Sequence, residues 1–376
     1  MPSLGNTLAA LKRQSGTFEP QLAGSGQLRD AGAFAPNPGA LKMWVHVPEG
    51  LATNAPLVVV LHGCGQTAEA YASGSGWITL ANRFGFALLC PEQTRSNNAN
   101  LCFNWFEPGD IARAGGEAAS IVAMVDHAIR EYDLDAGKVF VTGLSAGGAM
   151  TAVMLATYPE TFAGGAVIAG LPYGSARSMS EAFAAMNSAR TAGALAAGDA
   201  VRNASGGVGP WPPISIWHGQ SDAVVRPGAG EALAAQWANV HGVAGPPVTA
   251  RTPSGRDFLV WLTPDGDPVV ELHRIPGMGH GTPLSAGGID GSGTAGPFLL
   301  EVGVSSSLEI ALGWGIAQPS KAASVRPANG TKPKVRAIDK PTRRVEPPPV
   351  ASPSASPATG VAAVIEQALR TAGLMK

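Results

Sequence analysis

Short apolar runs alternate with longer stretches of helical periodicity along most of this chain, and this alternation constrains the fold more than any other feature. Residues 57–61, LVVVL, and residues 85–90, GFALLC, are apolar throughout rather than at every second position. A strand that is apolar on both faces is typical of a parallel sheet buried between helices. The sequence therefore predicts an α/β fold, with a mostly parallel sheet covered by helices on both faces.

The periodicity also gives the expected elements, with strands in β-branched runs and helices where apolar residues recur every three to four positions. The expected strands are Leu41–Val47, Leu57–Leu61, Gly85–Cys90, Lys138–Thr142, Ala166–Ala169, Ile214–His218 and Val269–Ile275. The expected helices are Glu117–Tyr132, Ala146–Thr157, Ser180–Ala197, Gly230–Val240 and Ser306–Ile316.

The composition of the sequence changes near residue 318, and we expect the 376 residues to form four parts. A segment of residues 1–24 precedes one catalytic domain of residues 25–317. Residues 318–360 are rich in proline and basic side chains and hold almost no large apolar residues, so they cannot bury enough surface to fold and form a linker. Residues 361–376 recover an apolar stripe at helical spacing and predict an amphipathic helix.

Charge and composition exclude several classes of protein. Apolar residues make up 45% of the chain and charged residues 14%, an enzyme-like balance, and the net charge is −1. Because the positive charge gathers in the linker and the body is acidic, no nucleic-acid partner is expected. No apolar stretch reaches the length of a membrane span. The N-terminus lacks an apolar segment of signal-peptide length, which predicts a cytoplasmic protein, or a secreted or periplasmic one if a leader was removed.

The stretch "KVFVTGLSAGGAM" carries the strongest chemical signal. Ser145 stands in Gly-Leu-Ser-Ala-Gly, directly after an apolar strand and directly before a helical run. The pentapeptide alone is weak in a glycine-rich chain, but strand, turn and helix together form the context of a nucleophile elbow. A glycine-rich turn with a capping serine is the alternative. We expect Ser145 to be a nucleophile.

A serine nucleophile needs a base, and the base needs a carboxylate to orient it. In the order Ser, Asp, His, the strand ends of residues 214–218 and 269–275 offer Asp222 and His280. Asp265 and Asp267 rival Asp222, but "TPDGDP" is typical of a hairpin turn. His218 abuts the turn at Asp222 and is expected to be structural.

The stretch "LVVVLHGCGQT" ends a strand where an oxyanion-binding loop is needed. We expect the backbone amides of Cys64 and Ala146 to be the donors, with Gln66 as a helper. As a nucleophile Cys64 lacks a base and an elbow, and as a metal ligand it lacks a companion at metal-binding spacing. A disulfide with Cys102 requires the loop "NNANLCFNWF" to fold over the site, and a reducing compartment would disfavour it.

Three blocks of the chain resemble the poly(3-hydroxybutyrate) depolymerase family of esterases, α/β-hydrolases related to feruloyl and acetylxylan esterases. They are "LHGCGQTAEAYASGSGWITLANRFGFALLCPEQTRSNNANLCFNWF", "VFVTGLSAGGAMTAVMLATYPETFAGGAVIAGLPYG", and "WHGQSDAVV" with "GMGHG". The resemblance covers about residues 35–315. It implies the α/β-hydrolase fold, a Ser145, Asp222 and His280 triad, an oxyanion hole framed by His62, Gly63, Cys64 and Ala146, and pairing of Cys64 with Cys102.

The sequence thus predicts a serine esterase that acts through an acyl-enzyme on hydroxyalkanoate oligomers, polyester or short acyl esters. No metal and no organic cofactor are implied. Alternatives are a feruloyl or acetylxylan esterase, a hydrolase of another polymer such as a polyamide, and a catalytically silent polymer-binding protein. Expected partners are an ester substrate, an insoluble polymer surface and a second copy of the chain. Four aromatic residues are candidates for the substrate pocket, with a core role as the alternative: Trp77, Phe103, Trp105 and Phe106.

Overall fold

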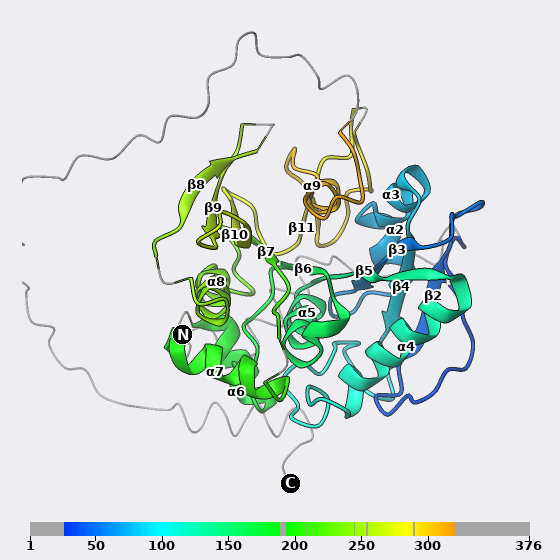
Figure 1. Ribbon diagram of the computed structural model, residues 1–376, viewed down its shortest axis with the longest axis horizontal. Helices are drawn as coiled ribbons and strands as arrows, with labels where there is room; N and C mark the ends of the chain where they lie inside the picture. Colours follow the sequence, from blue (N-terminus) through cyan, green and yellow to red (C-terminus); the bar gives the residue numbers. More distant parts are fainter. Residues whose placement is uncertain are drawn as a thin grey trace, which may run out of the picture. The chain divides into compact units, whose positions relative to one another are not determined.

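The structure is a computed structural model, drawn as a ribbon in Figure 1, and it describes residues 26–319 apart from 189–192, 208, 244, 253–254 and 289. The expected N-terminal segment 1–24, the linker beyond residue 319 and the helix 361–376 lie outside the described residues. Those expectations therefore stay predictions.

A ten-stranded sheet forms the centre of the described chain, in the order β1-β2-β4-β3-β5-β6-β7-β10-β9-β8. The six middle strands, from β4 to β10 in that order, pair in parallel, and antiparallel pairs lie at both edges. The bounds are β1 (Arg29–Asp30), β2 (Lys42–His46), β3 (Ala55–Leu61), β4 (Ala87–Glu92), β5 (Leu134–Leu144), β6 (Gly164–Ile168), β7 (Ile214–Gly219), β8 (Val248–Arg251), β9 (Asp257–Leu262) and β10 (Pro268–Ile275). β11 (Thr282–Leu284) and β12 (Leu299–Glu301) pair separately.

Both faces of the sheet are buried, as the fully apolar strands predict. In β3, Leu57, Val59 and Leu61 belong to one hydrophobic cluster, and Val58 and Val60 belong to a second. Successive side chains of a strand point to opposite faces, so the two clusters mark the two faces of the sheet.

Helices cover both faces, and Figure 1 shows them on the two sides of the sheet. The first cluster contains the buried sides of α4 (Gly116–Tyr132), α5 (Ala146–Thr157), α6 (Met179–Asn187), α7 (Ala194–Ala204) and α8 (Gly228–Val240). The second contains the buried sides of α2 (Ala68–Gly74), α3 (Trp77–Phe84) and α9 (Ser306–Gly313). A short 3₁₀ turn, η1, spans Pro159–Thr161. Parallel strands with helices on both faces confirm the α/β fold.

Each of the seven expected strands is present, and the turn at "TPDGDP" joins the antiparallel strands β9 and β10. The single helix expected over Ser180–Ala197 is wrong. α6 ends at Asn187 because Ser188 adopts an extended backbone (φ −124°, ψ 139°), and α7 begins only at Ala194. The short helices α2 and α3 were not expected, because glycines 74 and 76 interrupt their periodicity.

Candidate active site

Ser145 occupies a sharp turn between β5 and α5. Its backbone has φ 56° and ψ −114°, a conformation that non-glycine residues rarely adopt and that is typical of functional sites. The Ser145 N–H donates to the Ile168 carbonyl at 2.9 Å, which ties the turn to the end of β6. The turn therefore has the geometry of a nucleophile elbow.

The glycines of the Gly-x-Ser-x-Gly motif are required by close backbone contacts. A Cβ on Gly147 would overlap the carbonyl oxygens of Leu61 and His62 at the end of β3. A Cβ on Gly143 would overlap the backbone of Gly147 itself. The motif thus lets β3, β5 and α5 meet closely enough to hold Ser145 beside the loop that follows β3.

Asp222 follows β7, and His280 follows β10. One Asp222 oxygen accepts the backbone N–H groups of Val224 at 2.8 Å and Val225 at 2.9 Å. The other lies 2.7 Å from His280 Nδ1. Burial opposes ionisation of Asp222, but His280 and a hydrogen bond from His218 outweigh it, so the pKa of this carboxyl lies below its usual range. An ionised acid therefore holds the His280 ring by Nδ1 and leaves Nε2 to exchange a proton.

The His218 side chain contacts the Asp222 carboxylate and the turn around it. Its Nε2 donates to the Val225 carbonyl at 2.9 Å and lies 3.5 Å from Asp222 Oδ2. The ring is buried, and its Nδ1 has no hydrogen-bond partner in the described structure. These contacts agree with a structural role for His218 at the turn.

The three predicted side chains lie at one edge of the sheet. Ser145 follows β5, Asp222 follows β7 and His280 follows β10, which are parallel strands whose carboxyl ends meet there. Asp222 and His280 are almost fully buried, and Ser145 is 9% exposed. The structure thus brings Asp222 and His280 into direct contact and places Ser145 at the same edge.

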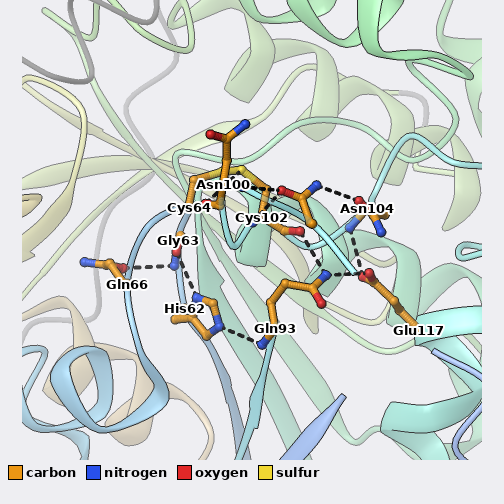
Figure 2. Close-up of a disulfide and its surroundings, with 10 residues drawn as sticks. His62, Gly63, Cys64, Gln66, Gln93, Asn100, Cys102, Asn104 and Glu117 are labelled. Carbon is orange, nitrogen blue, oxygen red and sulfur yellow. Dashed lines mark hydrogen bonds between the residues drawn. A yellow bond between two sulfur atoms is a disulfide. The ribbon is translucent and has the colours of Figure 1, made fainter. Parts of the chain in front are cut away.

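The loop after β3 is joined to a second loop by a disulfide, which Figure 2 shows with its surroundings. Cys64 and Cys102 are bonded, with their Cα atoms 4.2 Å apart. The Gly65 N–H donates to the Asn100 carbonyl at 2.9 Å, and the Gly63 N–H donates to Gln66 Oε1 at 2.9 Å. The pairing implied by the family resemblance is therefore present, and the Gln66 side chain contacts the loop backbone.

The backbone amides of Cys64, in the loop after β3, and of Ala146, which follows Ser145, have no partner among the described residues. Cys64 is fixed by its disulfide, and Ala146 begins α5. Amides of this kind are suited to bind an oxyanion.

His62 is buried beneath this loop. Its Nε2 accepts the Gln93 backbone N–H at 3.1 Å, so its Nδ1 carries the proton and donates to the Gly63 carbonyl at 2.8 Å. Burial lowers the pKa of His62, which fits the neutral ring that both bonds require. His62 therefore holds the loop from below.

The four aromatic candidates for a substrate pocket are buried. Trp77 is enclosed in the second cluster, stacked on Trp314 with ring centroids 5.8 Å apart. Phe103 is fully buried against His62 in the first cluster, together with Trp105 and Phe106. The structure does not bring Trp77 together with the other three.

Two residues that contact this loop were missed in the sequence. Gln93, at the end of β4, and Glu117, in the first turn of α4, are both buried and bonded to each other. An acidic residue at a helix start is usually exposed, so no pattern in the sequence indicates a buried one. No cluster of three or more His, Cys, Asp or Glu suited to a metal occurs in the described residues. Within the same residues, no helix is long and apolar enough to cross a membrane.

The fold is that of an α/β-hydrolase, and the comparisons with known proteins make the chain a carboxylic ester hydrolase. Residues 41–257 match the family described as Esterase PHB depolymerase, and the chain belongs to this family. A poly(3-hydroxyalkanoate) depolymerase C from Paucimonas lemoignei is 49% identical over 285 residues, which cover 75% of this chain and 69% of that protein. Feruloyl esterase B of Neurospora crassa is 34% identical over 256 residues, 66% of this chain and 86% of the relative.

A solved structure supports the same fold. The acetyl xylan esterase from Aspergillus awamori superposes with a TM-score of 0.64 at 26% identity, covering 78% of this chain and all of that one. The chain is thus an ester hydrolase related to a poly(3-hydroxyalkanoate) depolymerase, a feruloyl esterase and an acetyl xylan esterase.

Proposed function

We propose that the chain is a serine esterase that works through an acyl-enzyme. Ser145 Oγ attacks the ester carbonyl carbon, and His280 Nε2 takes the hydroxyl proton and passes it to the leaving alcohol. Water then attacks the acyl-enzyme, with His280 as the base. Asp222 orients His280, and the amides of Cys64 and Ala146 bind the oxyanion. The observation that carries this proposal is the 2.7 Å contact between His280 and Asp222 at the same sheet edge as the strained Ser145 turn.

The proposed substrates are hydroxyalkanoate esters, either oligomers or the polymer, and short acyl esters. The 49% identity to the Paucimonas lemoignei depolymerase supports this choice over a feruloyl or acetylxylan ester and over a polyamide. The catalytic groups do not distinguish these acyl donors. A panel of hydroxybutyrate oligomers, p-nitrophenyl esters, feruloyl esters and acetylated xylan separates them, and turnover of hydroxybutyrate oligomers at least tenfold above the feruloyl ester is expected.

The Ser145→Ala variant tests the mechanism. It should lose hydrolysis of p-nitrophenyl butyrate by about ten-thousandfold or more, since the nucleophile is removed. A Ser180→Ala variant on the exposed start of α6 is the matched control and should retain full activity. Retention of a tenth of the turnover by Ser145→Ala would contradict the assignment and favour the catalytically silent binding protein.

We also propose an oxidising compartment, either periplasmic or extracellular, in place of the cytoplasm that the N-terminal sequence alone favours. The Cys64–Cys102 disulfide supports this, because such bonds are rare in reducing compartments. The sequence of residues 361–376 supports a further proposal, that this segment binds a second copy of the chain or a polymer surface. Deletion of residues 319–376 should preserve activity on soluble esters and change either the mass by light scattering or the retention on polymer granules.

A further inference from the structure

A buried carboxylate lies behind the disulfide loop, at the start of α4. Glu117 is fully buried, and its Oε1 accepts Gln93 Nε2 at 2.6 Å while its Oε2 accepts the Asn104 backbone N–H at 2.9 Å. Asn97 Nδ2 adds a longer contact to Oε1 at 3.3 Å. Figure 2 shows Gln93 and Asn104 directed at the two oxygens. Each of these contacts is a donor, so the site is matched to a group that only accepts.

Gln93 connects Glu117 to the disulfide loop by hydrogen bonds. The same Nε2 that binds Glu117 also donates to the Cys102 carbonyl at 2.9 Å. The Gln93 backbone N–H donates to His62 Nε2 at 3.1 Å. Gln93 Oε1 accepts Asn97 Nδ2 at 2.8 Å, so both ends of its amide are used. One side chain therefore links the carboxylate to the disulfide partner of Cys64.

The contacts reach Cys64 from two directions. Through Cys102, Gln93 holds the residue that is covalently bonded to Cys64. Through His62, whose other nitrogen binds the Gly63 carbonyl, Gln93 holds the two residues that precede Cys64. The Cys64 amide is thus fixed on both sides by a group anchored at Glu117.

We propose that Glu117 and Gln93 are positioning residues that set the direction of the Cys64 amide toward the oxyanion. This inference rests on the proposed function, in which that amide is an oxyanion donor. Neither side chain touches the reacting atoms; they act through His62 and the disulfide. A second acid, Asp110, accepts the Glu117 N–H through Oδ1 at 3.3 Å and makes a side-chain hydrogen bond with Asn104.

Orientation rather than stability is the contribution of this carboxylate. Burial raises the pKa of Glu117 to about 8, so the ionised carboxylate carries a desolvation penalty that a glutamine removes. A glutamine in its place keeps the volume but turns an NH₂ group toward Gln93 Nε2 or the Asn104 N–H, which are themselves donors. One of those bonds is then lost, and the loop moves. We therefore expect Glu117→Gln to lose catalysis without a matching loss of thermal stability.

The experiment measures catalysis per active site in Glu117→Gln. At about pH 9, where Glu117 with its pKa of about 8 is ionised, the number of sites is titrated with a fluorophosphonate, and then kcat and KM for p-nitrophenyl butyrate and the Ki of a trifluoromethyl ketone are measured. The ketone adduct places its oxygen where the oxyanion forms. We expect kcat per titrated site to fall by about tenfold, less than the loss of an entire oxyanion donor, with KM within about twofold. The Ki should rise by the same factor as kcat falls.

Two further variants make the test decisive. In Glu181→Gln the altered carboxylate also lies in the first turn of a helix, α6, and accepts a backbone N–H, from Arg177 at 2.8 Å. It should leave kcat and Ki unchanged. If Glu117→Gln does not fold, Asn98→Ala decides, since Asn98 Oδ1 accepts the N–H groups of Asn100 and Cys102 on the same loop. It should give a smaller parallel change in kcat and Ki.

Wild-type kcat and Ki in folded Glu117→Gln, or in Asn98→Ala where that variant decides, would overturn the inference. So would a fall in the number of titrated sites with unchanged kcat per site, which is the result of a purely structural role. Failure of the proposed function gives a different result, because the wild-type enzyme itself would then not titrate with the fluorophosphonate.

Discussion

The two sides of the site are held in place by different physical means. On the elbow side, Ser145 is fixed by backbone contacts so close that Gly143 and Gly147 cannot carry a side chain. On the loop side, a disulfide and buried hydrogen bonds hold Cys64, and the neighbouring Gly65 has open space around the position of a Cβ. The glycines that permit the elbow packing lie in one short motif, whereas the loop depends on partners about 30 to 50 positions away. We therefore expect even small substitutions at the elbow to cost much stability and activity. Substitutions in the loop should reduce both only in part.

After Ser145→Ala, the largest predicted effect is at Asp222, the acid that contacts His280. Asp222→Asn should lower kcat by up to about ten-thousandfold, because the amide no longer selects the His280 tautomer with a proton on Nδ1. Steady-state kinetics on p-nitrophenyl butyrate measures the loss. Asp265→Asn, in the turn between β9 and β10, is the matched control and should be fully active. Greater loss in Asp265→Asn would overturn the choice of acid.

A pair of glycine substitutions compares the two sides directly. Gly147→Ala should cost at least about 3 kcal/mol of unfolding free energy and most of the activity, because the new methyl group overlaps the carbonyls of Leu61 and His62. Gly65→Ala meets no atom and only strains a backbone of φ 74°, so it should cost about 1 kcal/mol and retain activity. Urea unfolding and kinetics on both variants test this, and equal losses would remove the contrast between the sides.

Removal of the disulfide should affect stability more than chemistry. Cys102→Ala should lower the unfolding free energy by about 2–4 kcal/mol, since the bond closes a loop of 38 residues. Most of the activity should remain, because the proposed donor is the Cys64 amide and Gln93 still holds the residues before Cys64 through His62. Calorimetry gives the first quantity and kinetics the second. In Cys64→Ala, by contrast, lost acylation with a normal melting temperature would give the Cys64 sulfur a part in the chemistry.

The last prediction is a pH dependence of stability that arises from Glu117. Burial raises the pKa of Glu117 to about 8, against hydrogen bonds from Asn104 and Gln93 that lower it. Between the unfolded pKa of 4.5 and about pH 8 the folded state binds the extra proton, so this group makes stability fall as pH rises. Melting temperatures from pH 5 to pH 8 should therefore decline more in the wild type than in Glu117→Gln. Parallel curves would contradict this.

The contrast between the two sides also explains what the sequence could predict. The elbow was predictable because its strand, motif and helix are contiguous, and Asp222 and His280 followed from chain order and strand ends. Glu117 and Gln93 were not, because their bond appears only once β4 and α4 pack together. The aromatic residues expected in the pocket are core residues, since an apolar ring after a strand has the same sequence pattern in either place.

We propose that the elbow side carries the nucleophile, while the loop side supplies a positioned backbone amide. Fluorophosphonate labelling followed by peptide mass spectrometry tests it most directly, in the wild type and in Cys64→Ala. We expect one adduct, on Ser145, in both proteins. An adduct on any other residue, or none in the wild type, would contradict it.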